Sequence, residues 1–228
     1  MAAAPSQDDL NDGRATRAAV GRPGHDATAF RVPFVGLTGG LGSGKSTALA
    51  ALGRLGAATL STDAVVHELY RSDEVRDAVA ARWGADVIRA DGAVDRGAIA
   101  RHVFGDAAER EWLERLLWPL VGGRVAAFRT EQEAADPAPK AAVVETPLLF
   151  EAGMAGIYDA TIAIVADEDV RRTRAAARGH EAVDERTARQ LTQDEKAQRA
   201  TFVVHNDGSE ADLEAALSSV LAKLHVPR

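Results

Sequence analysis

Eight residues near the start of the chain combine small, cationic and hydroxyl side chains at a spacing that suits phosphate chemistry. They are Gly39-Gly40-Leu41-Gly42-Ser43-Gly44-Lys45-Ser46, which follow the pattern of a Gly, any four residues, and then Gly-Lys-Ser. Glycines allow the backbone to turn so that its N–H groups point at one anion. A lysine can reach the terminal phosphates of a nucleotide, and the serine hydroxyl can ligate Mg²⁺. The motif therefore predicts a nucleotide site with a bound magnesium ion.

The flanking segments supply the elements that such a loop needs. An apolar run, Val32–Leu37, precedes the loop, and a segment rich in Ala and Leu, Thr47–Leu55, follows it. A helix that begins directly after the loop adds the partial positive charge of its N-terminus. A flexible Gly/Ser turn is the alternative interpretation, but it gives Lys45 no role.

Five short segments are nearly continuous in apolar residues, which is typical of parallel strands covered on both faces. They are Val32–Thr38, Ala57–Leu60, Ala141–Glu145, Thr161–Val165 and Phe202–Val204. Because helical segments separate them, we predict an α/β protein with a parallel five-stranded sheet, of the P-loop nucleotide-kinase type. Ligands of such sheets bind beyond the carboxyl ends of the strands.

The long interval between the second and third predicted strands indicates an inserted, mostly helical subdomain, because a single crossover helix needs far fewer residues. We expect residues 31–63 and 140–228 to form the core, residues 64–139 to form this insert, and a stretch of about 168–200 to form a lid. Residues 1–30 contain no apolar stretch and are expected to be a disordered tail.

Composition argues against several classes of protein. The formal net charge of −7 is unusual for a general nucleic-acid binder, so we expect no nucleic-acid partner. The absence of cysteine excludes disulfides, thiolate metal sites and cysteine nucleophiles. No apolar run is long enough to span a membrane, and the start of the chain lacks a secretory pattern. We expect a cytoplasmic protein that is a monomer or a weak homo-oligomer.

Two carboxylates follow predicted strands at the edge where a ligand is expected. Asp63 comes directly after the second strand and could accept the proton of an alcohol as a phosphoryl group is transferred to it. It could instead only cap the helix that starts at Ala64. Glu145 ends the third strand, where it could hold the water shell of Mg²⁺, orient an acceptor, or simply be solvated.

Arginines recur at helical spacing in the predicted lid, at positions Arg171, Arg174 and Arg178. Cationic side chains that close over a transferring phosphoryl group stabilise its charge and expel water. The alternative is a salt-bridged surface helix, because Glu168 and Asp169 lie among these arginines.

Several further segments resemble one family, the dephospho-coenzyme A kinases, over residues 33–225. The matching segments are the strand and loop Val35–Thr47, Trp83-Gly84 with Asp91–Arg96, Trp112–Leu120, and the distinctive block Pro147–Glu151, which resembles the family's Pro-Leu-Leu-Phe-Glu. The resemblance implies that ATP phosphorylates the ribose 3′-hydroxyl of dephospho-coenzyme A, the last step of coenzyme A biosynthesis. It also implies that the insert holds the pantetheine arm and the nucleotide of this acceptor.

The resemblance implies roles for individual residues. Asp63 would be the base, Lys45 would bridge the β- and γ-phosphates, and Arg174 and Arg178 would balance the charge of the moving phosphoryl group. The residues expected around ATP are Gly39, Leu41, Gly42, Ser43, Gly44, Lys45, Ser46, Thr47 and, near the adenine, Asn206. Mg²⁺ is expected at Ser46 and Glu145.

Four positions depart from the family pattern. Ser61 replaces an Asp, Trp118 replaces the His of a His-Pro pair, Glu145 stands where Asp is usual, and Thr201 replaces an Asp before the last strand. Two alternatives therefore stay open: a kinase of another nucleoside or nucleotide, and a regulator that binds a nucleotide without catalysis.

Overall fold

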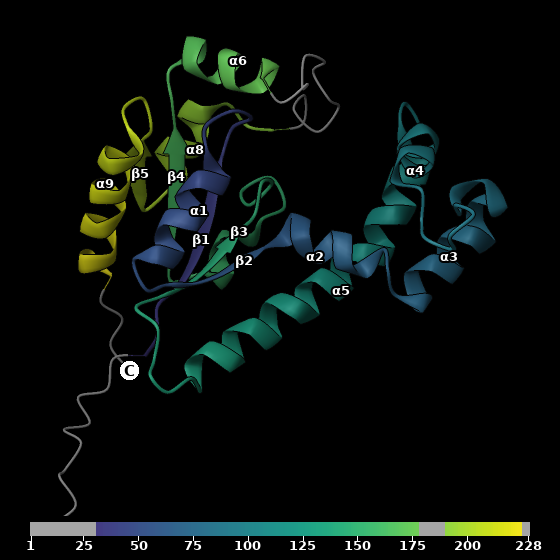
Figure 1. Ribbon diagram of the computed structural model, residues 1–228, viewed down its shortest axis with the longest axis horizontal. Helices are drawn as coiled ribbons and strands as arrows, with labels where there is room; N and C mark the ends of the chain where they lie inside the picture. Colours follow the sequence, from purple (N-terminus) through teal and green to yellow (C-terminus); the bar gives the residue numbers. More distant parts are fainter. Residues whose placement is uncertain (1–30, 178–189, 225–228) are drawn as a thin grey trace, which may run out of the picture.

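The computed structural model describes residues 31–177 and 190–224 (Figure 1). The predicted tail, residues 1–30, and the part of the predicted lid that contains Arg178 lie outside the described residues. In the described part of the chain, five strands form a parallel sheet in the order β2-β3-β1-β4-β5. The predicted fold class is therefore confirmed.

The strands run close to their predicted positions and bring their carboxyl ends to one edge. They are β1 (Phe34–Gly39), β2 (Ala58–Ser61), β3 (Ala142–Glu145), β4 (Ala160–Val165) and β5 (Phe202–His205). In the register of the sheet, Leu37 of β1 and Ser61 of β2 both lie beside Glu145 of β3. The segments that leave β1, β2 and β3 at this edge are therefore neighbours.

The connections between strands are mostly helical. The helices are α1 (Lys45–Arg54), α2 (Thr62–Leu69), α3 (Asp73–Trp83), α4 (Arg96–Val103), α5 (Ala107–Glu133), α6 (Glu168–Ala176), α8 (Gln193–Arg199) and α9 (Glu210–Lys223), with short 3₁₀ turns η1 (Ala85–Val87) and η2 (Met154–Ile157). In Figure 1, α1 and α9 lie together beside the sheet, whereas α3 and α4 lie well away from it. Among the described residues, no helix combines the length and apolar character needed to cross a membrane.

Alternate residues of the central strands pack against opposite layers, as a strand period of two requires. Leu37 belongs to the cluster that β1 forms with α1 and α9, where Leu52 and Leu217 are fully buried. Phe34 points to the other face and packs in a cluster with Phe128 of α5. The sheet is thus covered on both faces, which explains why its strands are continuously apolar.

A third cluster lies apart from the sheet and joins α3, α4 and the first half of α5, with Val79, Ile99 and Leu117 among its buried members. The 27-residue helix α5 contributes to two clusters, because its second half packs Val125 against the sheet. Pro119 lies inside α5 between these two halves. The second half of α5, which the sequence analysis assigns to the insert, therefore packs on the core.

Candidate active site

The phosphate loop joins β1 to α1 through a backbone that only glycine adopts easily. Gly44, the N-cap residue of α1, has a φ of 92°, in the left-handed region that costs other residues free energy. A Cβ added to Gly44 would lie 2.1 Å from Nδ2 of Asn206. Backbone conformation and close packing therefore both require glycine at this position.

The N-terminus of α1 offers its N–H groups to an anion. Among the residues that the structure describes, no side chain caps this helix, and no acidic residue lies in its first turn. By contrast, the side chains of Ser72, Asp95 and Asp106 cap α3, α4 and α5. The Oγ of Ser43 is buried, and no described residue is its hydrogen-bond partner. Open N–H groups beside this hydroxyl fit the phosphates of ATP.

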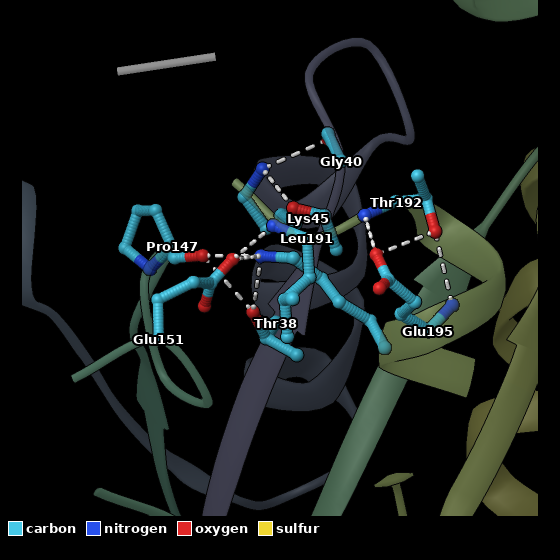
Figure 2. Close-up of polar contacts among 10 residues, drawn as sticks. Thr38, Gly40, Lys45, Pro147, Glu151, Leu191, Thr192 and Glu195 are labelled. Atoms are coloured by element: carbon cyan, nitrogen blue, oxygen red, sulfur yellow. Dashed lines mark hydrogen bonds and ion pairs between the residues drawn. The ribbon is translucent and has the colours of Figure 1, made fainter. Parts of the chain in front are cut away.

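Lys45 begins α1 and folds back across the loop. Its Nζ donates hydrogen bonds to the carbonyl oxygens of Gly39 and Gly40, both at 3.1 Å (Figure 2). Burial lowers the pKa of the Lys45 amine, and the charges of Glu145 and Asp63 act in the opposite direction. The amine therefore lies over the loop within electrostatic range of both predicted site carboxylates.

Glu145 ends β3 and contacts Ser61 of the neighbouring strand. Its Oε2 accepts a hydrogen bond of 2.7 Å from Oγ of Ser61. Burial raises the pKa of the Glu145 carboxyl, and the hydrogen bond from Ser61 opposes this shift. Two of the four departures from the family pattern thus contact each other. An aspartate at position 61 would face the Glu145 carboxylate directly, and like charges at this range repel.

Asp63 lies in the first turn of α2, immediately beyond the carboxyl end of β2. The N-cap residue of α2 is Ser61, so Asp63 is a helical residue and does not cap the helix as the alternative interpretation required. The charge of Asp63 raises the pKa of both Lys45 and Glu145. The charge of Asp63 therefore acts on both of these groups at the same sheet edge.

The helix α6 places Arg171 directly on the phosphate loop. Its Nε donates to the carbonyl oxygen of Leu41 at 2.9 Å, and its guanidinium pairs with Glu168 at 2.8 Å. The approach is so close that a Cβ on Gly42, where φ is 75°, would lie 2.4 Å from the backbone oxygen of Arg171. The helical spacing of arginines pointed to this residue, but the sequence analysis did not place it at the site.

Asn206 is buried beneath the loop and holds its backbone. Its Nδ2 donates to the carbonyl oxygen of Ser43 at 2.8 Å, and its own N–H donates to the carbonyl oxygen of Val165. Arg174 of α6 donates from Nη1 to the carbonyl oxygen of Asn206 at 2.9 Å. Asn206 therefore links β4, α6 and the phosphate loop, a positioning role that sequence reasoning did not assign to it.

The predicted residues of the described chain gather at one edge of the sheet. The loop and the first turn of α1 carry Gly39, Leu41, Gly42, Ser43, Gly44, Lys45, Ser46 and Thr47, beside Asp63, Glu145, Arg174 and Asn206. Ser46 is exposed at the start of α1, and Glu145 ends the strand next to β1. Hydroxyl and carboxylate oxygens suit Mg²⁺, which takes few protein ligands and completes its shell with phosphates and water.

The two other departures from the family pattern have different surroundings. Thr201 exchanges two hydrogen bonds of 3.0 Å with Thr161, one from each backbone N–H to the other hydroxyl. This pair lies at the amino ends of β4 and β5, at the edge opposite the site. The Thr201 departure therefore leaves the site unaffected. The side chain of Trp118 is half-exposed on α5.

A buried ion pair joins α8 to the segment that follows β3. The Lys196 side chain is fully buried, with Nζ 3.0 Å from Oε1 of Glu151 and 2.6 Å from the carbonyl oxygen of Pro147 (Figure 2). The same Glu151 oxygen accepts a hydrogen bond from the N–H of Leu191. Burial lowers the pKa of the Lys196 amine, and Glu151 opposes this shift. The distinctive block Pro147–Glu151 thus anchors Leu191 and Lys196, which belong to the last part of the predicted lid.

Replacing Lys196 with Met should lower the free energy of unfolding by about 3–5 kcal/mol, because the buried Glu151 carboxylate then lacks a cationic partner. Urea unfolding followed by circular dichroism measures the change. Lys223→Met, an exposed lysine on α9, is the matched control and should stay within about 0.5 kcal/mol of wild type. The double variant Lys196→Met/Glu151→Gln should recover part of the loss. A Lys196→Met protein as stable as wild type would contradict this account.

Comparison with known proteins gives a consistent set of relatives. The family model for dephospho-CoA kinase matches residues 33–212. The dephospho-CoA kinase of Anaeromyxobacter dehalogenans (strain 2CP-C) is 39% identical over 194 residues, which cover 83% of this chain and 91% of the relative. The dephospho-CoA kinase of Moorella thermoacetica is 40% identical over 194 residues, which cover 83% of this chain and 89% of the relative. Among solved structures, TT1252 from Thermus thermophilus shares 35% identity at a TM-score of 0.68, covering 85% of this chain and 98% of that one.

Proposed function

Because this chain belongs to the dephospho-CoA kinase family, we propose that it catalyses the last step of coenzyme A biosynthesis. In this reaction the γ-phosphoryl group of ATP moves to the ribose 3′-hydroxyl of dephospho-coenzyme A, and ADP leaves. The observation that supports the proposal most directly is the meeting of a phosphate loop with Asp63 and Glu145 at one sheet edge.

The loop would hold the donor. Backbone N–H groups of residues 42–46 surround the β-phosphate, and the hydroxyl of Ser43 gains the partner that it lacks among described residues. Lys45 exchanges the carbonyl oxygens of Gly39 and Gly40 for oxygens of the β- and γ-phosphates. Ser46 and Glu145 would hold Mg²⁺, which when bound neutralises charge that develops between these phosphates.

Asp63 would act on the acceptor. As the 3′-oxygen forms its bond to the γ-phosphorus, the bond from that phosphorus to the bridging oxygen of ADP breaks. The hydroxyl proton passes to a carboxylate oxygen of Asp63, and the electron pair of the broken bond stays with ADP. Asp63 follows β2 and the loop follows β1, and only β3 lies between these two strands, which supports this role.

The arginines would balance the charge of the moving group. Arg171 is held against the loop by the carbonyl oxygen of Leu41, and Arg174 lies on the same helix beside Asn206. A guanidinium in this region can bind two phosphate oxygens at once. Arg174 and Arg178 remain our predicted contacts to the γ-phosphoryl group. A cytoplasmic location and a monomeric or weakly oligomeric state remain predictions as well.

Mass spectrometry of the products tests the proposed function. Incubation with MgATP and dephospho-coenzyme A should give coenzyme A that carries the new phosphate on the ribose 3′-oxygen, with one ADP for each product. A parallel panel of nucleosides and nucleoside monophosphates tests for another acceptor. If ATP binds but no acceptor gains a phosphate, the chain is a nucleotide-binding regulator instead.

A further inference from the structure

The buried ammonium of Lys196 joins three segments that lie far apart in the sequence. Its Nζ donates to the carbonyl oxygen of Pro147 at 2.6 Å, pairs with Oε1 of Glu151 at 3.0 Å, and lies 3.5 Å from Oγ1 of Thr38 (Figure 2). These partners come from the end of β1 and from the segment after β3, whereas Lys196 itself belongs to α8. One side chain therefore ties α8 to the ends of two neighbouring strands, and both strands lead into the candidate active site.

Stability alone does not account for a lysine at this position. The Lys196 side chain is fully buried, and moving an ammonium out of water costs free energy that one ion pair often fails to recover. Replacing both partners of such a pair by apolar side chains of similar volume is often neutral or stabilising. What an apolar side chain lacks is the three N–H donors that the lysine ammonium brings to one point. The function of Lys196 that such a residue could not supply is therefore to hold several acceptors at once.

The carbonyl oxygen of Pro147 is the acceptor at the shortest distance from Lys196, and it has a second donor. Oγ1 of Thr38 donates to the same oxygen at 3.2 Å. The residue before Pro147, Thr146, donates from its N–H to the carbonyl oxygen of Leu37 at 2.8 Å. The turn after β3 is therefore bonded to the end of β1 at two successive residues, and Lys196 supplies the charged contact.

This turn lies where the two halves of the candidate active site meet. Glu145 ends β3 two residues before Pro147, and the phosphate loop begins one residue after Thr38. Burial lowers the pKa of the Lys45 amine most, and the charge of Lys196 acts in the same direction. The Lys196 ammonium therefore lies within electrostatic range of the amine that the loop carries, beside the strand end that carries the Glu145 carboxylate.

We propose that Lys196 is a positioning residue for phosphoryl transfer. Its ammonium holds the turn after β3 at the end of β1, and thereby sets the place of Glu145 relative to the phosphate loop. A misplacement of about 1 Å in such a site can lower a rate about 10²-fold, although every reacting group is still present. The proposal rests on the proposed function and adds to it a residue that acts from within the protein interior, through the backbone of its neighbours.

Two variants separate this role from a contribution to stability. Glu151→Gln removes the anionic partner but keeps an amide oxygen for Lys196 and for the N–H of Leu191. Its free energy of unfolding should fall, because a buried ammonium then lacks its anion, but its kcat should stay within about threefold of wild type. Lys196→Met/Glu151→Gln should be at least as stable as Glu151→Gln. Its kcat at saturating MgATP should nevertheless be about 10- to 100-fold lower, with KM for dephospho-coenzyme A within about twofold of wild type.

Steady-state kinetics and urea unfolding of both variants decide between the two roles. If kcat follows stability, so that Glu151→Gln is the slower enzyme, Lys196 contributes to stability only and the proposal fails. The proposal also fails if the double variant is as active as Glu151→Gln.

A third variant tests the same contact without removing a charge. Thr38→Val removes the second donor to the Pro147 carbonyl oxygen and should lower kcat about 3- to 10-fold, the value of one neutral hydrogen bond. The matched control is Thr130→Val, because the Thr130 hydroxyl donates to a carbonyl oxygen on the exposed side of α5, and it should retain wild-type kcat. A wild-type kcat for Thr38→Val would overturn the proposal, also where the Lys196 variant does not fold.

Hydrogen exchange measured by NMR tests the positioning without any substrate. In Lys196→Met/Glu151→Gln, the N–H of Thr146 should exchange about 10-fold faster than in Glu151→Gln, because the turn after β3 opens locally. The N–H of Val143, inside β3, should exchange at an unchanged rate. Equal rates at Thr146, or the same acceleration at both sites, would overturn the proposal. A wild-type protein that leaves dephospho-coenzyme A unphosphorylated would contradict the proposed function instead, and the exchange rates would still decide the role of Lys196.

Discussion

An Asp63→Asn variant should turn over dephospho-coenzyme A about 10²–10⁴ times more slowly than wild type, with its affinity for ATP unchanged. The amide keeps the size and shape of the carboxylate but cannot accept the proton of the attacking hydroxyl, and general-base assistance contributes a factor of this size. A coupled assay of ADP release at saturating MgATP measures the change in kcat. Calorimetric titration measures the affinity for ATP.

The matched control for Asp63→Asn is Asp77→Asn, because Asp77 is an exposed aspartate on α3 whose partner, Arg76, is also on the surface. This variant should retain wild-type kcat. A kcat for Asp63→Asn within a few-fold of wild type would show that Asp63 is not the base. Transfer would then depend on positioning and electrostatic stabilisation by the loop and the arginines alone.

Replacing Lys45 with Met should lower kcat by about 10²–10³-fold, the loss that follows removal of one preorganised group that stabilises transition-state charge. Met preserves the length of the side chain and removes the ammonium, which the structure places over the loop at the carbonyl oxygens of Gly39 and Gly40. Steady-state kinetics with dephospho-coenzyme A measures the change, with Lys223→Met, an exposed lysine at the end of α9, as the control.

A second variant separates charge from geometry at this position. Lys45→Arg keeps the positive charge, but its planar guanidinium cannot take the place of a compact ammonium between two phosphates. We expect it to recover only a small part of the lost kcat. Full activity in Lys45→Met would show that the Lys45 ammonium does not stabilise the transition state.

The elements that the sequence predicted well are those whose signals are local. The buried strands are short apolar runs, such as the one that contains Val143, and both of their neighbouring layers are apolar. The phosphate loop follows from the spacing of its glycines and Lys45, because a tight turn around an anion permits few residue types. The last helix follows the same rule, because Leu213 and Leu217 recur at helical spacing and are both buried.

The features that the sequence did not predict depend on contacts between distant segments. Lys196 sits among Asp194 and Glu195, a setting typical of a solvated surface, yet its side chain is fully buried against Glu151. The contact between Ser61 and Glu145 depends on the register of β2 and β3, which are separated by the whole insert. No local sequence pattern specifies how β2 and β3 align, so the departures at Ser61 and Glu145 looked independent in the sequence.

The long helix α5 joins the insert to the core. Its first half packs in the cluster with α3 and α4, and its second half packs on the sheet that carries the phosphate loop. Turning the insert as a body would have to pull Phe128 out of its contacts beneath the sheet or bend the helix at Pro119. The position of the insert relative to the phosphate loop is therefore established when the chain folds.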